Sequence, residues 1–165
     1  MPNEPTRIAG DLIVTGGLAV GSLTLPSSSV VNASVAAGAD IDAAKFIHPI
    51  RVTEAQDNVA AADETRIIHV ARRAGTVVSF RAGSIAIAVG NAIATVDLKK
   101  NGTTVLSAVI TLDNANTNRV AEAGTINTAA YVAGDVFEWV VVDTIGTGTL
   151  PTGVFCHMEA LEDPT

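Results

Sequence analysis

Residues 97–112 read DLKKNGTTVLSAVITL, and this stretch decides the fold class. Asn101 and Gly102 stand between two runs that are rich in β-branched and other apolar residues. A tight two-residue hairpin turn needs positive φ at both central positions, and Asn-Gly is a pair that tolerates this well. The stretch therefore predicts an antiparallel hairpin with strands over 94–100 and 103–112.

Short runs with the alternation typical of strands continue on both sides of this hairpin. They recur at regular spacing, and no convincing long helical pattern interrupts them. About seven or eight short strands are typical of an all-β fold, and the sequence predicts an antiparallel β-sandwich or jelly roll. Besides the hairpin strands, the predicted strands span residues 65–72, 76–83, 84–89, 118–126, 135–144 and 153–162.

The sequence before this domain has a different composition. Residues 27–46 read SSSVVNASVAAGADIDAAKF, in which most side chains are small and Phe46 is the only aromatic one. Such a stretch is too poor in large side chains to offset the cost of ordering its own backbone. We therefore expect residues 1–50 to form an extended attachment and oligomerisation segment with short strands, packed by neighbouring chains. Residues 51–165 are expected to form the β-sandwich domain. The alternative is that the segment folds back over the β-domain of its own chain.

The charge and the apolar pattern of the chain exclude several classes of protein. Its 10 Lys and Arg stand against 17 Asp and Glu, a formal net charge of −7, whereas phosphate binding needs clustered basic residues. The two basic pairs, Arg72-Arg73 and Lys99-Lys100, are expected to be solvated strand ends. No apolar run approaches the roughly 18 residues of a membrane helix, and the N-terminus lacks the pattern of a secretory leader. We expect a protein made in the cytoplasm that binds neither nucleic acid nor membrane.

The residues that most often carry chemistry form no recognisable site in the sequence. Cys156 lies in an alternating run, where a buried structural thiol is expected. His48, His69 and His157 lack partners at metal-ligand spacing. Residues 113–118 offer carboxylate and amide oxygens, which indicate a surface turn or, as the alternative, a cation site.

Two carboxylates, Glu138 and Asp143, flank the apolar run of residues 139–142. Both are expected to face outward from a strand, because a glycosidase would need its carboxylate pair inside a cleft. The glycine-containing stretches match no phosphate-binding motif. The sequence therefore predicts no catalytic residue, no cofactor and no metal, and the protein is not expected to be an enzyme.

Four stretches of the chain follow one another in a familiar order. They are GDLIVTGGLAVGSLTLP (10–26), SSVVNASVAAGADIDAAKF (28–46), DLKKNGTTVLSAVITLDNAN (97–116) and IGTGTLPTG (145–153). Together they resemble the small virion structural proteins of tailed phages and prophages, of the head-decoration (cement) or head-fibre type. The resemblance covers most of the chain and rests on the overall pattern rather than on a diagnostic motif.

This resemblance implies a homotrimer whose N-terminal segment attaches to the particle while a compact β-domain projects outward. The implied function is that of a capsid decoration protein, which binds the major capsid protein and reinforces the shell at the capsid surface of the virion. The alternative is a head or tail fibre that recognises a host-surface glycan, with exposed aromatics and amides on loops such as 113–118 and 145–152. The resemblance implies no catalytic residue.

Contacts with the capsid or with sister copies are expected from the larger apolar side chains of the N-terminal segment. These candidates are Leu12, Val14, Leu18, Val20, Leu23, Leu25, Val30, Val31, Val35, Ile41 and Phe46. Hydrophobic residues make up 48% of the chain, which is hard to hide inside one small sandwich. Phe137, Trp139 and Phe155 are therefore candidates for contacts between copies, although a place in the core of their own domain is the default expectation for each.

Overall fold

A computed structural model of the chain describes residues 47–164, and these residues form an antiparallel β-sandwich without a helix. The predicted all-β fold class is confirmed. Because the described residues contain no helix, they include none that could span a membrane. The strands are β1 (His48–Ala55), β2 (Glu64–Val70), β3 (Gly75–Ala86), β4 (Val89–Gly90), β5 (Ile93–Lys100), β6 (Thr103–Thr104), β7 (Ile110–Leu112), β8 (Ala121–Ala123), β9 (Ala130–Tyr131), β10 (Val136–Thr144), β11 (Gly148–Thr149) and β12 (Thr152–Glu162).

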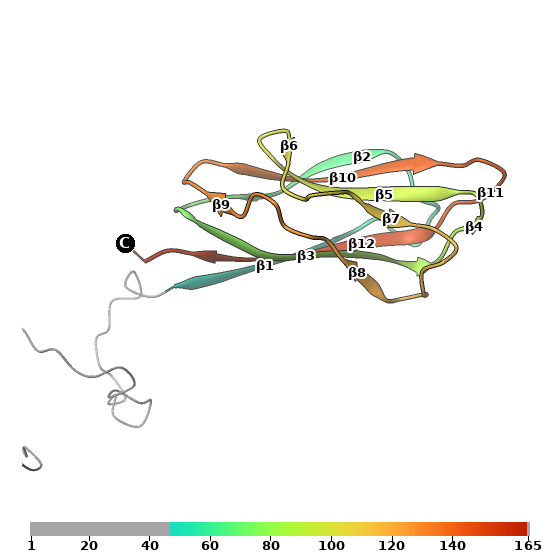
Figure 1. Ribbon diagram of the computed structural model, residues 1–165, viewed down its shortest axis with the longest axis horizontal. Helices are drawn as coiled ribbons and strands as arrows, with labels where there is room; N and C mark the ends of the chain where they lie inside the picture. Colours follow the sequence, from blue (N-terminus) through green and yellow to red (C-terminus); the bar gives the residue numbers. More distant parts are fainter. Residues whose placement is uncertain (1–46, 165) are drawn as a thin grey trace, which may run out of the picture. The chain divides into compact units, whose positions relative to one another are not determined.

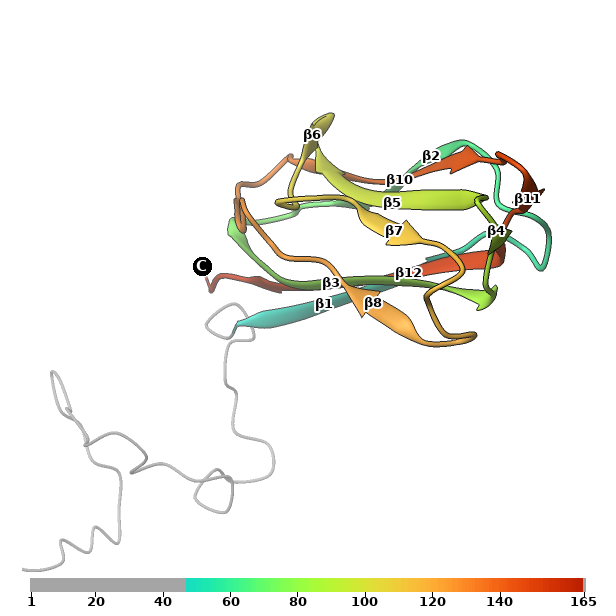
Figure 2. The ribbon, with the colours of Figure 1, turned by 45° about the vertical axis from the view of Figure 1, so that its right-hand side comes forward.

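Two five-stranded sheets form the layers of the sandwich (Figure 1). Sheet A has the strand order β1-β12-β3-β8, with β9 also paired to β3. Sheet B has the order β2-β10-β5-β6, with β7 also paired to β5. A short sheet of β4 and β11 lies at one end of the domain (Figure 2). Strands β1 and β2, which follow one another in the chain, are therefore the edge strands of different sheets.

The Asn-Gly hairpin is confirmed. Lys99 pairs with Thr104 and Lys100 with Thr103, which leaves a two-residue loop between β5 and β6. Asn101 and Gly102 have φ of 51° and 80°, as this turn requires. The predicted strand over 103–112 is wrong in its middle part, because the chain leaves the ladder after β6 and rejoins it at β7.

Strand β3 and strand β1 also differ from the prediction. The predicted strand over 76–83 and the first half of the one over 84–89 are one continuous strand, β3, which lies between β12 and β8, and Val89 belongs to β4. Strand β1 was not predicted, and it begins at His48, so the last three residues of the range 1–50 belong to it. The candidate contact residues from Leu12 to Phe46 and the predicted short N-terminal strands lie outside the described residues.

One apolar core fills the space between the sheets. Its largest fully buried side chains include Trp139, Phe80, Phe137, Leu98 and Met158. The hypothesis that Phe137 and Trp139 contact sister copies is therefore wrong, because their own domain already buries them.

Phe155, the third aromatic candidate for contacts between copies, is half-buried on the outer face of sheet A. It pairs with Gly83 on β3, and a Cβ added to Gly83 would lie 2.7 Å from the ring carbon Cζ of Phe155. The ring therefore covers the backbone of its cross-strand glycine, which leaves it only partly accessible to another chain.

Candidate functional site

The outer side of sheet A carries polar cross-strand pairs, and the half-buried Phe155 and the exposed Val78 belong to the same sheet. Successive side chains of a strand point to opposite faces, so Arg51 and Thr53 of β1 share the outer face with Glu159 and His157 of β12. Arg51 Nε donates to Glu159 Oε1 at 3.1 Å. Thr53 Oγ1 lies 2.9 Å from His157 Nδ1. The two residues of each pair satisfy each other's hydrogen-bonding groups. His157 is one of the three histidines that have no second ligand at metal-binding spacing in the sequence.

The outer face of sheet B combines apolar and polar side chains. Phe137, Trp139 and Val141 of β10 are buried in the core, so the alternate residues of this strand face away from it. The register places Val140 beside Thr65, Val142 beside Thr95, and Glu138 between Ile67 and Lys99. Asp97 lies opposite Val140 on the same side, and its Oδ1 accepts from Thr104 Oγ1 at 2.6 Å. We call Thr65, Ile67, Thr95, Asp97, Lys99, Glu138, Val140 and Val142 the sheet B face.

Branched side chains stand exposed on the sheet B face. Ile67 is 63% exposed and Val142 is 47% exposed. Glu138 and Lys99 lie directly opposite one another on neighbouring strands, as a cross-strand pair of opposite charge. The exposed Ile and Val on the broad side of a sheet make this face a candidate for contact with another protein.

The outward orientation predicted for two carboxylates holds for one of them. Glu138 belongs to the sheet B face, whereas Asp143 lies five positions further along β10 and so on the opposite side of the strand. The backbone N–H of Asp143 donates to Asp63 Oδ1 at 2.9 Å. The two carboxylates therefore do not form a pair.

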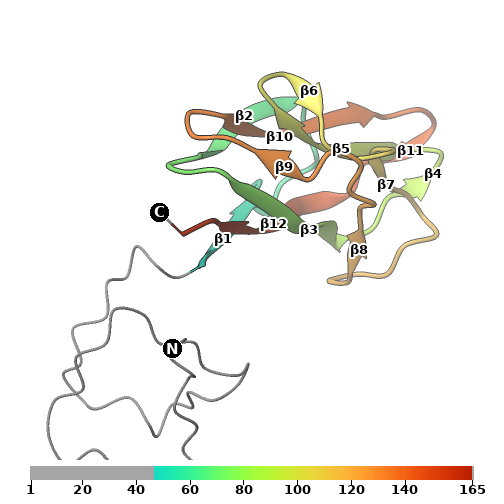
Figure 3. The same cartoon turned by 60° about the vertical axis from the view of Figure 1, so that its left-hand side comes forward.

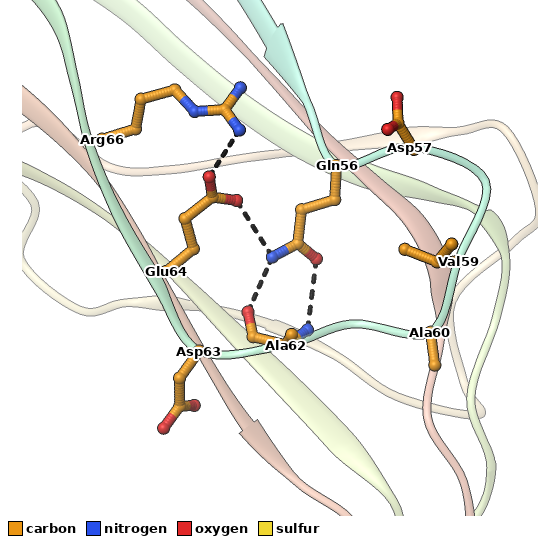
Figure 4. A pocket seen from close by; sticks show the side chains of 8 residues that line it. All are labelled: Gln56, Asp57, Val59, Ala60, Ala62, Asp63, Glu64 and Arg66. Carbon is orange, nitrogen blue, oxygen red and sulfur yellow. Dashed lines mark hydrogen bonds and ion pairs between the residues drawn. The ribbon is translucent and has the colours of Figure 1, made fainter.

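A pocket of about 330 Å³ lies at the corner where β1 passes into β2 (Figure 4). Gln56 closes this corner: its Nε2 donates to Ala62 O at 2.6 Å and to Glu64 Oε2 at 3.2 Å, and its Oε1 accepts from Ala62 N at 3.3 Å. The lining residues are Gln56, Asp57, Val59, Ala60, Ala62, Asp63, Glu64 and Arg66. The amide thus ties both ends of the connecting loop together.

Arg66 joins the two sheets at this corner. Its Nη1 donates to Glu54 Oε2 at 2.8 Å and its Nη2 donates to Glu64 Oε1, while the guanidinium carbon lies 5.6 Å from the centroid of the Trp139 ring. The hydrogen bonds to Glu54 and then Glu64 raise the pKa of Arg66 above its ordinary value. Glu54 is on β1 and Arg66 on β2, so this network clamps the edges of sheets A and B. Its polar groups satisfy each other, which is typical of a structural role.

The surroundings of Cys156 and His69 indicate structural roles for both side chains. Cys156 is fully buried, and loss of hydration raises the pKa of its thiol to about 12, which confirms the predicted structural thiol. The His69 ring stacks on Phe137 with centroids 6.1 Å apart, and its Nε2 is 3.7 Å from Glu162 Oε1. Over residues 47–164, no group of three or more His, Cys, Asp and Glu is placed to hold a metal ion.

The oxygen-rich loop 113–118 is a surface turn in which side chains bond to the backbone. Asp113 Oδ1 accepts from Ala115 N at 2.8 Å, and Asn116 Oδ1 accepts from Asp113 N at 2.6 Å. Asn118 Oδ1 accepts from Ile87 N at 2.8 Å. These acceptors are engaged within the chain, which favours the turn over the cation site that was its alternative.

The comparisons with known proteins add no family to this geometry: no family model matches the chain, and no curated protein matches it either.

Sequence reasoning missed the residues that make up the two candidate regions. Ile67 and Val142 lie on the same face only through the pairing of β2 with β10. Arg66 reaches Glu54 only because the edges of two sheets meet at one corner. The alternation of strand residues indicated which side chains share a face, but it did not indicate which strands are neighbours.

Proposed function

We propose that the protein is a structural assembly protein that packs against copies of itself through the sheet B face. In its narrower form, the proposal is a capsid decoration (cement) protein that binds the major capsid protein of a tailed phage as a homotrimer. The observation that supports self-association is the exposure of Ile67 and Val142 on the sheet B face, where they are 63% and 47% exposed.

The physical argument for contact between copies starts from the exposed apolar area. Full burial of one Val or Ile side chain contributes about 1.5–3 kcal/mol, and each copy in an assembly would bury its own Ile67 and Val142. Obligate interfaces are more apolar than ordinary surfaces. The opposite charges of Glu138 and Lys99 let two copies pair across the contact, although the whole chain carries a net charge of −7. In a threefold ring, the sheet B face of each copy would pack against a different surface of the neighbouring copy, and the ring is closed.

The capsid part of the proposal rests on the resemblance to virion proteins. In this proposal the N-terminal segment grips the major capsid protein, and the β-domain projects from the particle surface. A protein that binds only the assembled shell stabilises it by mass action. The alternative, a fibre that recognises a glycan, needs accessible aromatic rings, whereas the Phe, Tyr and Trp side chains of the described residues are all buried or half-buried.

The first test is the oligomeric state of an Ile67→Glu variant. We expect light scattering to give a trimer mass for the wild type, three times the 16.8 kDa of one chain, and a monomer mass for the variant. A carboxylate at this position would have to be buried without a partner in the interface. Ile145→Glu is the matched control, because Ile145 is 59% exposed on the loop after β10 and lies outside the sheet B face.

We expect the control to stay trimeric, and both variants to keep the unfolding midpoint of an intact domain because they change exposed residues. A monomeric wild type, or a trimeric Ile67→Glu variant, would refute the assignment of this face.

The second test is a deletion of residues 1–46. Strand β1 begins at His48, so this deletion keeps every described strand, whereas a cut after residue 50 would remove partners of Glu162, Leu161 and Ala160. We expect the truncated protein to keep its β-rich circular dichroism and to stop co-sedimenting with undecorated capsids. Host cells in a parallel tube test the glycan alternative. Retained binding to capsids would move the attachment site into the β-domain.

A further inference from the structure

A second pocket, of about 200 Å³, lies at the opposite end of the β1 strand from the corner pocket. Its lining residues are His48, Ile50, Arg72, Arg73 and Glu162. They come from the start of β1, the turn between β2 and β3, and the end of β12. Figures 1 and 3 show these three segments at the same end of the sandwich. We call this the basic pocket.

The residues that line the basic pocket carry more positive than negative charge. Among the described residues, the ion pairs involve Arg51, Arg66, Lys100 and His69, and neither Arg72 nor Arg73 takes part in one. Glu162 is 4% exposed and already engaged, because its Oε1 accepts from Arg72 N at 3.0 Å and lies 3.7 Å from His69 Nε2. Two guanidinium groups and one carboxylate leave an excess of one positive charge.

Two hydrogen-bonding nitrogens of the basic pocket are buried without a partner in the part of the chain that the structure describes. They are Nη1 of Arg73 and Nε2 of His48. Buried donors are normally paired, and the donors of a guanidinium are always charged. The pair Arg72-Arg73 was expected to be a solvated strand end. This expectation agrees with Arg72, which is exposed, but not with Arg73, whose Nη1 is buried.

We propose that the basic pocket binds a single carboxylate, which accepts hydrogen bonds from Arg73 Nη1 and from His48 Nε2. The buried Glu162 carboxylate limits the charge of the ligand. Its negative charge offsets one of the two guanidinium charges, so the pocket favours a monoanion and repels a phosphate dianion. The carboxylate can belong to an acidic side chain or to the C-terminus of another protein chain. This site is separate from the sheet B face and does not depend on the proposed function.

The test is a titration of the full-length protein followed by NMR of the His48 ring and the Arg73 side chain, with sodium chloride adjusted to hold the ionic strength constant. The probes are acetate, inorganic phosphate, and two tripeptides: acetyl-Gly-Glu-Gly-amide and acetyl-Gly-Gly-Gly with a free C-terminus. We expect saturable shifts with acetate and weaker binding of phosphate. Binding of either tripeptide supports the site and identifies which kind of carboxylate it accepts.

Matched variants separate the site from a general effect of charge. Arg73→Gln is expected to weaken acetate binding about tenfold or more, because it removes a charged donor. Arg51→Gln removes the same charge from the exposed face of sheet A and is expected to bind acetate like the wild type. His48→Gln changes the other buried nitrogen and tests the site independently if Arg73→Gln does not fold, with a severalfold loss expected.

Three results would overturn the proposal: no saturable shift with acetate, tighter binding of phosphate than of acetate, or equal losses in Arg51→Gln and Arg73→Gln. Binding of acetate without binding of either tripeptide would also overturn it, because the proposed ligand is part of a protein chain.

Discussion

Trp139→Ala is expected to lower the free energy of unfolding by about 3–5 kcal/mol, the range for removal of a large aromatic side chain from a core. Trp139 is fully buried on the inner side of β10, and the Arg66 guanidinium lies 5.6 Å from its ring centroid. The variant loses the burial of the indole ring and leaves a cavity beneath the clamp of β1 and β2. Urea unfolding followed by circular dichroism measures the change, since the variant has no tryptophan left for fluorescence.

Two matched variants make this prediction specific. Trp139→Phe keeps most of the ring and removes Nε1, which is buried without a hydrogen-bond partner among the described residues, so its loss should be much smaller. Val132→Ala changes an apolar residue that is exposed in the turn before β10, and it should stay within about 0.5 kcal/mol of the wild type. A loss below about 1 kcal/mol for Trp139→Ala would show that the ring is not packed as the structure has it.

The parts of the fold that could be predicted are those whose cause is local. The hairpin at Asn101-Gly102 needs only two residues with positive φ between alternating runs, so the sequence contains all the necessary information. Strand β1 was missed because it carries Pro49 near its start and charged residues further on. An edge strand pairs on one side only, which lets such a sequence remain in the sheet.

The candidate surfaces could not be predicted in the same way, because they depend on which strands are neighbours. Ile67 and Val142 share a face only through the register of β10 with β2. The basic pocket joins His48, Arg73 and Glu162, which are far apart in the sequence and meet at one end of the sandwich. Local alternation identifies the exposed side of each strand and contains no information on these pairings.

The stability of the protein is expected to fall as the pH rises above 9, and Cys156 is the main cause at the start of this range. Burial raises the pKa of its thiol from 9.0 to about 12. Below pH 9 the thiol is protonated in both the native and the unfolded state, so it has no effect on the pH dependence. Above pH 9 the unfolded chain loses this proton while the native protein keeps it, which favours unfolding.

The size of the effect follows from the width of this window. The free energy of unfolding should fall by about 1.4 kcal/mol per pH unit, which gives a loss of roughly 2–3 kcal/mol at pH 11. Tyr131 acts in the same direction from a higher pH, because burial, with a smaller contribution from Glu162, raises the pKa of its hydroxyl from 10.0 to about 12. Its contribution begins only near pH 10, and the thiol alone therefore sets the initial slope.

Cys156→Ala isolates the contribution of the thiol, because the variant retains Tyr131 and every other group that titrates at high pH. A constant loss from the smaller side chain is expected at all pH values. Against this offset, the wild type should lose roughly 2 kcal/mol more than the variant between pH 9 and pH 11. Urea unfolding at pH 8, 9, 10 and 11 under reducing conditions measures both curves. Parallel curves would contradict this prediction, because they would mean that the thiol ionises as readily in the native protein as in the unfolded chain. The complete burial of Cys156 between the sheets predicts the opposite.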